Sequence, residues 1–184
     1  MGELWLVRHG ETPWSKTGQH TGRTDVPLTK HGEDQARDLR PRLDRPWTLV
    51  LTSPLVRARK TAELAGLSAV ENDGLMEWDY GHAEGRTTAE LNRERNGWSV
   101  WTDEHLPESP ADVGRRAEAV LELIAPALDI GDVCLVGHGQ ALRILSATWL
   151  GLPAVDGRLF ALSAGSVSVL GHEHELPVMV RWNT

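Results

Sequence analysis

The feature that most constrains this chain is an apolar run near the amino terminus that ends in charged residues. Leu4-Trp5-Leu6-Val7 is typical of a strand buried on both faces at the centre of a parallel sheet. The run leads into Arg8 and His9, and Thr12-Pro13 then has the pattern of a helix cap followed by proline. The stretch therefore predicts Arg8 and His9 at the carboxyl end of a strand, where open α/β sheets bind ligands.

Two interpretations of Arg8 and His9 are open at this point. A guanidinium is a planar fork for phosphate oxygens, and a neutral imidazole is a nucleophile, so the pair suits phosphate chemistry. The alternative is a surface arginine–histidine pair that ends a strand and has no chemical role. The choice depends on what the rest of the chain places at the same edge of the sheet.

The other apolar runs predict alternating strands and helices. Residues 13–28 suit a loop, because they are rich in glycine, threonine and charge. Strands are expected at 49–51, near 69–70, and at 133–136, 166–170 and 178–182. Helices are expected over 30–40, 55–65 and 88–94, from 109 onward, and after Gly139 up to an end at Gly151. We predict an α/β fold, a three-layer α/β/α sandwich with a mostly parallel central sheet.

Length and composition limit the classes of protein. At 184 residues, with no repeat or linker, residues 1–184 are expected to form a single domain. The net charge of −7 argues against a nucleic-acid or anionic-membrane partner. The lone Cys134 lies in an apolar run and is expected in the core. With no signal-peptide pattern or membrane-spanning run, we expect a cytoplasmic protein, and a homodimer is left open.

Two further strands are also followed by reactive residues. Arg57 comes just after the strand at 49–51, and His138 follows the strand at 133–136. In a parallel sheet these ends meet Arg8 and His9 at one edge, which predicts an anion pocket suited to phosphate. Metal hydrolysis fits poorly because the arginines would repel a cation, and no dinucleotide or P-loop motif occurs, so neither metal nor cofactor is expected.

Four segments, in order along the chain, carry a resemblance to a known family. Residues 6–12, 53–62, 77–81 and 137–139 resemble the histidine phosphatase superfamily, in its phosphoglycerate mutase-like branch. Stretches at 20–22, 77–81 and 98–102 are more similar to bacterial acid phosphatases than to glycolytic mutases. Glu108-Ser109 and Asp112-Val113 resemble a secondary pattern of the family, without its usual preceding glycines.

The resemblance implies a catalytic role for each matching residue. His9 is expected to be the nucleophile that forms a phosphohistidine, and Glu77 the acid and base for the leaving alcohol and the water. Arg8, Arg57 and His138 are expected to hold the phosphoryl oxygens. The remaining substrate or phosphate contacts are expected from Thr21, Gly22 and Ser15, although family members often carry asparagine at the last position. For Glu77, a loop carboxylate paired with an arginine is the alternative.

The function expected from these residues is a metal-independent phosphomonoesterase with a small phosphorylated substrate and inorganic phosphate as product. A phosphoglycerate mutase and a catalytically silent phospho-ligand-binding module are the alternatives. Against the mutase, Arg86, Arg93 and Arg95 are expected to be solvated on a helix. An open mouth lined by Trp78, with Trp98 and Trp101, is expected to admit water and favour hydrolysis.

Overall fold

A six-stranded sheet forms the centre of the molecule. The computed structural model describes residues 1–184. The strands are β1 (Leu4–Arg8), β2 (Leu49–Thr52), β3 (Val70–Glu71), β4 (Val133–Gly137), β5 (Val167–Glu173) and β6 (Leu176–Arg181), in the order β3-β2-β4-β1-β5-β6. The first four strands of this order are parallel, whereas β5 is antiparallel to both β1 and β6. The predicted α/β fold with a mostly parallel sheet is confirmed.

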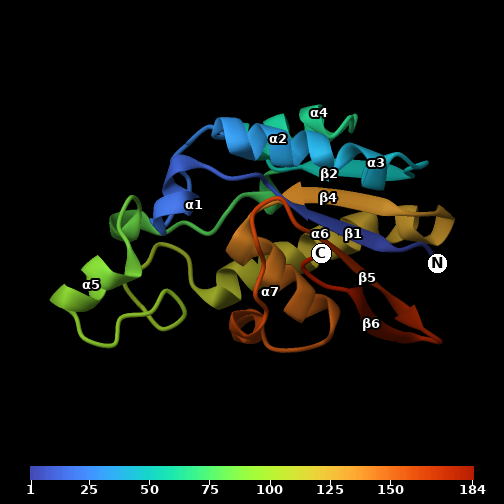
Figure 1. Cartoon of the computed structure of the whole chain (residues 1–184). Helices are drawn as coiled ribbons and strands as arrows, with labels where there is room; N and C mark the ends of the chain where they lie inside the picture. Colours follow the sequence, from blue (N-terminus) through green and yellow to red (C-terminus); the bar gives the residue numbers. More distant parts are fainter.

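Helices cover both faces of the sheet. They are α1 (Pro13–Thr17), α2 (Lys30–Asp38), α3 (Arg40–Leu43), α4 (Val56–Leu64), α5 (Thr88–Glu94), α6 (Pro110–Ile130) and α7 (Gly139–Trp149), with short 3-10 turns at Asp73–Leu75, Gly81–Ala83 and Ala154–Leu159. Figure 1 shows α2, α3 and α4 on one face and α6 and α7 on the other. None of these helices has the length and apolar character needed to cross a membrane.

The alternation of side chains along β1 explains why its sequence is apolar throughout. Leu4 and Leu6 belong to the core under α6 and α7, with partners such as Ile124. Trp5 and Val7 belong to the core on the opposite face, which α2, α3 and α4 cover. Because both faces of the strand are buried, every position of the run from Leu4 to Val7 must be apolar.

Two predicted boundaries differ from the structure. The helix expected over 30–40 is divided into α2 and α3, because Pro41 has no N–H for the carbonyl of Arg37. The helix start predicted at Thr12-Pro13 is confirmed as α1, so the loop expected at 13–28 begins only after Thr17, and the cap of α1 is reciprocal. The Ser15 amide donates to Thr12 Oγ1 at 3.1 Å, and the Thr12 amide donates to Ser15 Oγ at 2.8 Å.

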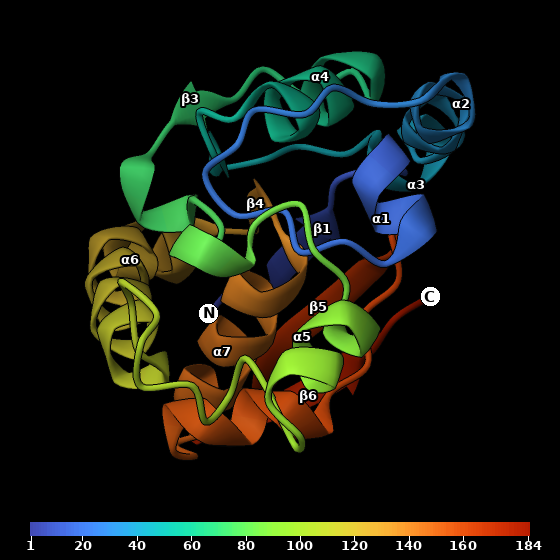
Figure 2. The same ribbon diagram turned by 90° about the vertical axis from the view of Figure 1, so that its left-hand side faces the viewer.

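The carboxyl ends of the parallel strands are partly covered by α1, α5 and the segments beside them. Figure 2 turns this side toward the reader, with α1 and α5 in front. Residues 78–106 form a third apolar cluster, which packs against Val113 of α6 and against Ala141 and Ile144 of α7. The sheet thus supplies the floor of a site at this end, and these segments supply its walls.

Candidate active site

The strand ends bring four of the predicted residues together. β1 pairs with β4 so that Arg8 lies opposite Gly137, which places His9 and His138 side by side. Their ring centroids are 5.2 Å apart, and the Nε of Arg57 lies 3.1 Å from Nδ1 of His138. Since His9 is only 4% exposed, its interpretation as a surface residue is wrong.

The environment of His9 keeps its ring neutral and sets its tautomer. Nδ1 lies 2.7 Å from the carbonyl oxygen of Gly10, which can only accept a hydrogen bond. Nδ1 therefore carries the proton, and Nε2 has the free lone pair. Burial, followed by the charges of Arg57 and Arg8, holds the pKa of His9 well below its usual value. A neutral imidazole with a free Nε2 is a nucleophile at neutral pH.

His138 is held from both sides of its ring. The guanidinium of Arg57 donates through Nε to Nδ1 at 3.1 Å, and Nε2 lies 2.7 Å from Oγ of Ser53. Because arginine cannot accept, Nδ1 is the acceptor, and in the neutral ring Nε2–H donates to Ser53. Burial, followed by the charges of Arg57 and His9, holds the pKa of His138 well below its usual value.

Arg57 is fully buried and supports the first loop from behind the cluster. Its Nη1 donates to the carbonyl of Thr24 at 2.9 Å, and its Nη2 donates to the carbonyls of Gly22 at 2.8 Å and Thr21 at 3.3 Å. These acceptors explain how an arginine is accommodated in the first turn of α4, where the helix dipole opposes a cation. Arg57 does not line the pocket surface, so its direct contact with phosphate stays a prediction.

Arg8 presents an unsatisfied donor next to His9. Its Nη1 donates to the carbonyl of Leu162, but its Nε is buried without any hydrogen-bond partner. The guanidinium packs over Gly139, where a side-chain Cβ would lie 3.2 Å from Cζ of Arg8. A buried N–H without an acceptor is costly, so the position of this guanidinium calls for a functional reason.

Glu77 is anchored on the first turn of α7. Its Oε1 accepts from the backbone amides of Ala141 and Trp78, both at 2.9 Å, and its Oε2 accepts from that of Gln140 at 3.0 Å. A helix amino terminus stabilises a carboxylate at this position. No basic side chain lies within ion-pair distance of Glu77, so the alternative of a loop carboxylate paired with an arginine is wrong.

The pocket itself is polar and lies against Arg8, His9 and Glu77. Of the other predicted contacts, Thr21 and Ser15 line it, whereas Gly22 is buried behind it. A Cβ at Gly22 would approach the carbonyl oxygen of Trp78 to 2.6 Å, which explains the glycine. Phosphate contacts by these three residues stay predictions.

Comparison with known proteins decides the family. The family model described as histidine phosphatase superfamily (branch 1) matches residues 4–184. The chain belongs to the histidine phosphatase superfamily. This phosphatase is 40% identical over 176 residues to an acid phosphatase of Mycobacterium tuberculosis, covering 93% of this chain and 87% of the relative.

Two other relatives extend the comparison. The chain is 35% identical over 188 residues to a probable phosphoglycerate mutase GpmB of Klebsiella pneumoniae, covering 94% of this chain and 86% of the relative. A solved structure of an open-reading-frame product from Mycobacterium tuberculosis matches with a TM-score of 0.92 at 38% identity, covering 99% of this chain and 97% of that one. The resemblance to this superfamily and to its acid phosphatases is therefore confirmed.

Several pocket residues of this histidine phosphatase were not predicted from the sequence. They are Gly18, Gln19, His20, Tyr80, Gly139, Gln140, Arg143 and Leu162. Arg143 donates to the carbonyls of Gly157 at 2.9 Å and Arg158 at 2.8 Å and to Oε1 of Gln140 at 2.7 Å, and no carboxylate pairs with it. It is therefore a positioned cation on the pocket wall with only neutral acceptors. Arg143 lies about one turn into the helix that follows His138, and this position in the sequence could have indicated that it faces the pocket.

The predicted tryptophan-lined mouth is wrong. Trp78 is fully buried and Trp98 is 5% exposed, and both belong to the apolar cluster of residues 78–106. Trp101 packs against that cluster and under Arg143, whose Cζ lies 5.1 Å from the indole centroid. Large aromatic side chains release more free energy when buried than at an open rim, and here they build the wall rather than the entrance.

Two buried neutral histidines in the histidine phosphatase predict a pH dependence of stability. Below pH 6.5 the unfolded chain binds protons at His9 and His138, whereas the folded chain, with both pKa values lowered, does not. The free energy of unfolding should therefore fall as pH decreases from 6.5, by up to about 2.7 kcal/mol per pH unit for the two groups.

Urea unfolding between pH 7.5 and 5.5, in buffers without phosphate, measures this slope above the range where carboxylates titrate. Replacing both His9 and His138 with glutamine should reduce the slope to the smaller part left by His20, whose pKa burial also lowers. Replacing the exposed His31 should leave the slope unchanged. A stability that is independent of pH over this interval in the wild-type chain contradicts the buried neutral assignment.

Proposed function

We propose that this histidine phosphatase is a metal-independent phosphomonoesterase that hydrolyses small phosphate monoesters through a phosphohistidine intermediate on His9. The observation that carries the proposal is the neutral, buried His9, whose Nδ1 is bound to the carbonyl of Gly10. His9, Glu77 and Arg8, whose buried Nε has no partner, all line the same pocket.

The first step transfers the phosphoryl group to the enzyme. Nε2 of His9 forms a bond to phosphorus while the bond between phosphorus and the ester oxygen breaks. A protonated Glu77 gives its proton to that oxygen, so the alcohol leaves as a neutral molecule. Arg8, together with Arg57 and His138, stabilises the charge on the three remaining phosphoryl oxygens.

The second step returns the enzyme to its starting state. Water attacks phosphorus, the bond to Nε2 of His9 breaks, and Glu77 takes a proton from the water as it attacks. Inorganic phosphate leaves with the oxygen of that water. The same carboxyl group thus acts as acid in the first step and as base in the second.

The positive charge that phosphoryl transfer needs is proposed to come from Arg8 and Arg57. No three His, Cys, Asp or Glu side chains lie close enough to share a metal ion. Thorough chelation should therefore leave the rate of phosphate release within about twofold of the untreated enzyme. Loss of activity with chelator and its recovery with one particular divalent ion would contradict the proposal.

A second candidate function is phosphoglycerate mutation, which one observation favours. Arg143 is a pocket cation without a carboxylate partner and could pair with the carboxylate of a phosphoglycerate. The basic residues of the 81–108 segment do not line the pocket. Arg86 pairs with Glu94, and Arg95 pairs with the buried Asp103 at 3.0 Å, so these two are not simply solvated. A silent binding module ranks last because His9 and Glu77 are both in place.

A direct test follows 3-phosphoglycerate and a panel of other phosphomonoesters by phosphorus NMR. We expect release of inorganic phosphate from several panel members with chelator present. Efficient conversion of 3-phosphoglycerate into 2-phosphoglycerate without phosphate release establishes the mutase instead. No turnover of any ester, together with tight binding of phosphate, establishes the silent module.

A further inference from the structure

The short segment that carries Glu77 is fixed to α6 by one arginine. Nη1 of Arg116 donates to the carbonyl oxygens of Gly74 at 2.9 Å and Met76 at 2.6 Å. The segment also lies close to α6 at Gly74, where a Cβ would approach Cγ2 of Val120 to 2.6 Å. The carbonyl that immediately precedes Glu77 is therefore tied to the helix.

On the other side of Glu77, the same segment is fixed by Glu108. The backbone amide of Asp79 donates to Oε2 of Glu108 at 2.8 Å. The indole Nε1 of Trp78 donates to the carbonyl oxygen of Glu108 at 2.7 Å. Contacts from Arg116 and Glu108 thus fall on residues immediately before and after Glu77.

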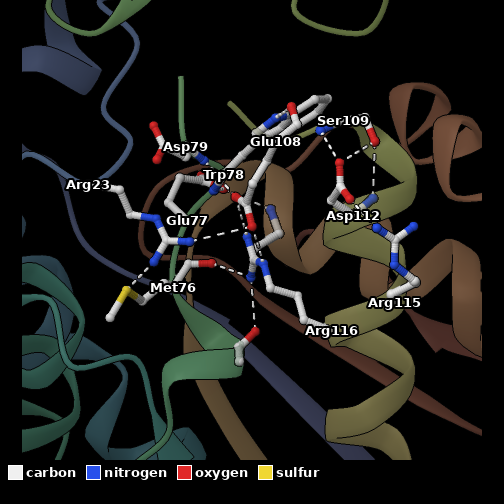
Figure 3. A network of polar contacts seen from close by, with 12 residues as sticks. Arg23, Met76, Glu77, Trp78, Asp79, Glu108, Ser109, Asp112, Arg115 and Arg116 are labelled. Carbon is white, nitrogen blue, oxygen red and sulfur yellow. Dashed lines mark hydrogen bonds and ion pairs between the residues drawn. The ribbon is translucent and has the colours of Figure 1, made fainter. Parts of the chain in front are cut away.

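Arg116 and Glu108 also hold each other. Nε of Arg116 lies 3.0 Å from Oε1 of Glu108, and Nη2 lies 3.3 Å from Oε2, which makes the pair bidentate (Figure 3). Arg23 adds a longer contact to Oε1 at 3.4 Å. Burial opposes ionisation of Glu108, but the hydrogen bonds and charge of Arg116 keep the pKa of its carboxyl below its usual value.

The carboxyl end of Glu77 is fixed independently, by α7. The amides of Gln140 and Ala141 have no backbone acceptor and donate only to the two oxygens of Glu77. Because α7 holds the carboxyl group of Glu77, the backbone of Glu77 must be held at a distance from α7 that the side chain can span. Neither Glu108 nor Arg116 lines the pocket, so their direct contacts reach the reaction through the Glu77 segment. At longer range, the charge of Arg116 also helps to lower the pKa of His138.

We propose that Glu108 and Arg116 are positioning residues for Glu77, which set the place of its backbone so that its carboxyl group meets α7 and the leaving oxygen. The catalytic part of this inference rests on the proposed function. Displacing a catalytic group by up to about 1 Å from its productive position typically lowers the rate about 10- to 100-fold. The loss should fall on the step that needs the proton.

The test compares Arg116→Met with Arg115→Met. Arg115 is the neighbouring residue on α6, but it is largely exposed and turns toward Asp112, away from the Glu77 segment (Figure 3). In Arg116→Met, kcat should fall about 10- to 100-fold on glycerol 2-phosphate, whose alkoxide needs a proton, and less than about threefold on 4-nitrophenyl phosphate. Arg115→Met should match the wild type on both substrates. Equal losses of Arg116→Met on both substrates overturn the proposal.

A combination with Glu77→Gln separates positioning from general damage. If Arg116 acts through Glu77, adding Arg116→Met to Glu77→Gln should change kcat on glycerol 2-phosphate by less than about twofold. Multiplication of the two single effects shows that Arg116 acts elsewhere and overturns the proposal. If Arg116→Met does not fold, Glu108→Gln takes its place, since its amide oxygen can still accept from Asp79 while the ion pair is lost.

A second readout does not depend on phosphatase activity. Hydrogen exchange by NMR at the amides of Gln140 and Ala141 reports whether the Glu77 carboxylate occupies its site on α7. Both amides should exchange faster in Arg116→Met, as in Glu77→Gln, and be unchanged in Arg115→Met. Unchanged exchange in Arg116→Met overturns the positioning role. If the wild-type enzyme hydrolyses none of the esters but the two amides exchange faster in Arg116→Met, the proposed function is overturned and the positioning role is supported.

Discussion

Replacing His9 with alanine is expected to lower kcat for every phosphomonoester by about 10⁴-fold or more while the chain stays folded. The variant removes the atom that would bond to phosphorus, and no other nucleophile takes its place. His138 is the nearest imidazole, but both of its nitrogens are engaged, with Arg57 and with Ser53. Steady-state phosphate release measures the loss of kcat, and far-ultraviolet circular dichroism shows whether the variant stays folded.

A covalent intermediate gives the same prediction a direct chemical signature. Wild-type enzyme mixed with substrate labelled in its phosphate and quenched within milliseconds should retain label that is stable to alkali and lost in acid. His9→Ala should retain none, whereas the exposed control His31→Ala should behave like the wild type. Activity of His9→Ala within about tenfold of the wild type contradicts the mechanism.

The residues predicted best are those whose signal is local. Arg8, His9 and His138 each stand directly after an apolar strand, so the parallel topology alone brings them together. Ser53 follows β2 in the same way and now pairs with His138, and the same argument would have found it. A serine after a strand is a weaker indication of a functional site than a histidine, because serine is common in ordinary loops.

The residues that sequence reasoning missed reach the pocket through packing between distant segments. Tyr80 and Leu162 depend on how residues 78–106 and the loop before β5 lie across the strand ends, which no periodicity encodes. From the sequence, the indole of Trp78 is predicted at an open mouth of the pocket. Its Nε1–H finds the carbonyl of Glu108, so the whole ring can be buried without an unsatisfied donor.

Replacing Glu77 with glutamine is expected to slow alkyl phosphates far more than nitrophenyl phosphate. An alkoxide leaves poorly without a proton, and general acid catalysis typically supplies about 10²- to 10⁴-fold, so kcat on glycerol 2-phosphate should fall by that amount. The nitrophenolate ion leaves without a proton, so kcat on nitrophenyl phosphate should fall by less than about tenfold. The ratio of the two kcat values is therefore the quantity to measure.

The geometry around Glu77 makes this substitution more than a loss of one proton. Both carboxylate oxygens accept backbone N–H groups at the start of α7, and the NH₂ of glutamine cannot accept either of them. Asp79→Asn is the matched control, since Asp79 lies two residues away, does not line the pocket and accepts only the amide of Gly81 at 3.0 Å. That variant should leave the ratio unchanged. Equal losses on both esters in Glu77→Gln would remove Glu77 from the acid role and leave the leaving oxygen to be protonated by solvent.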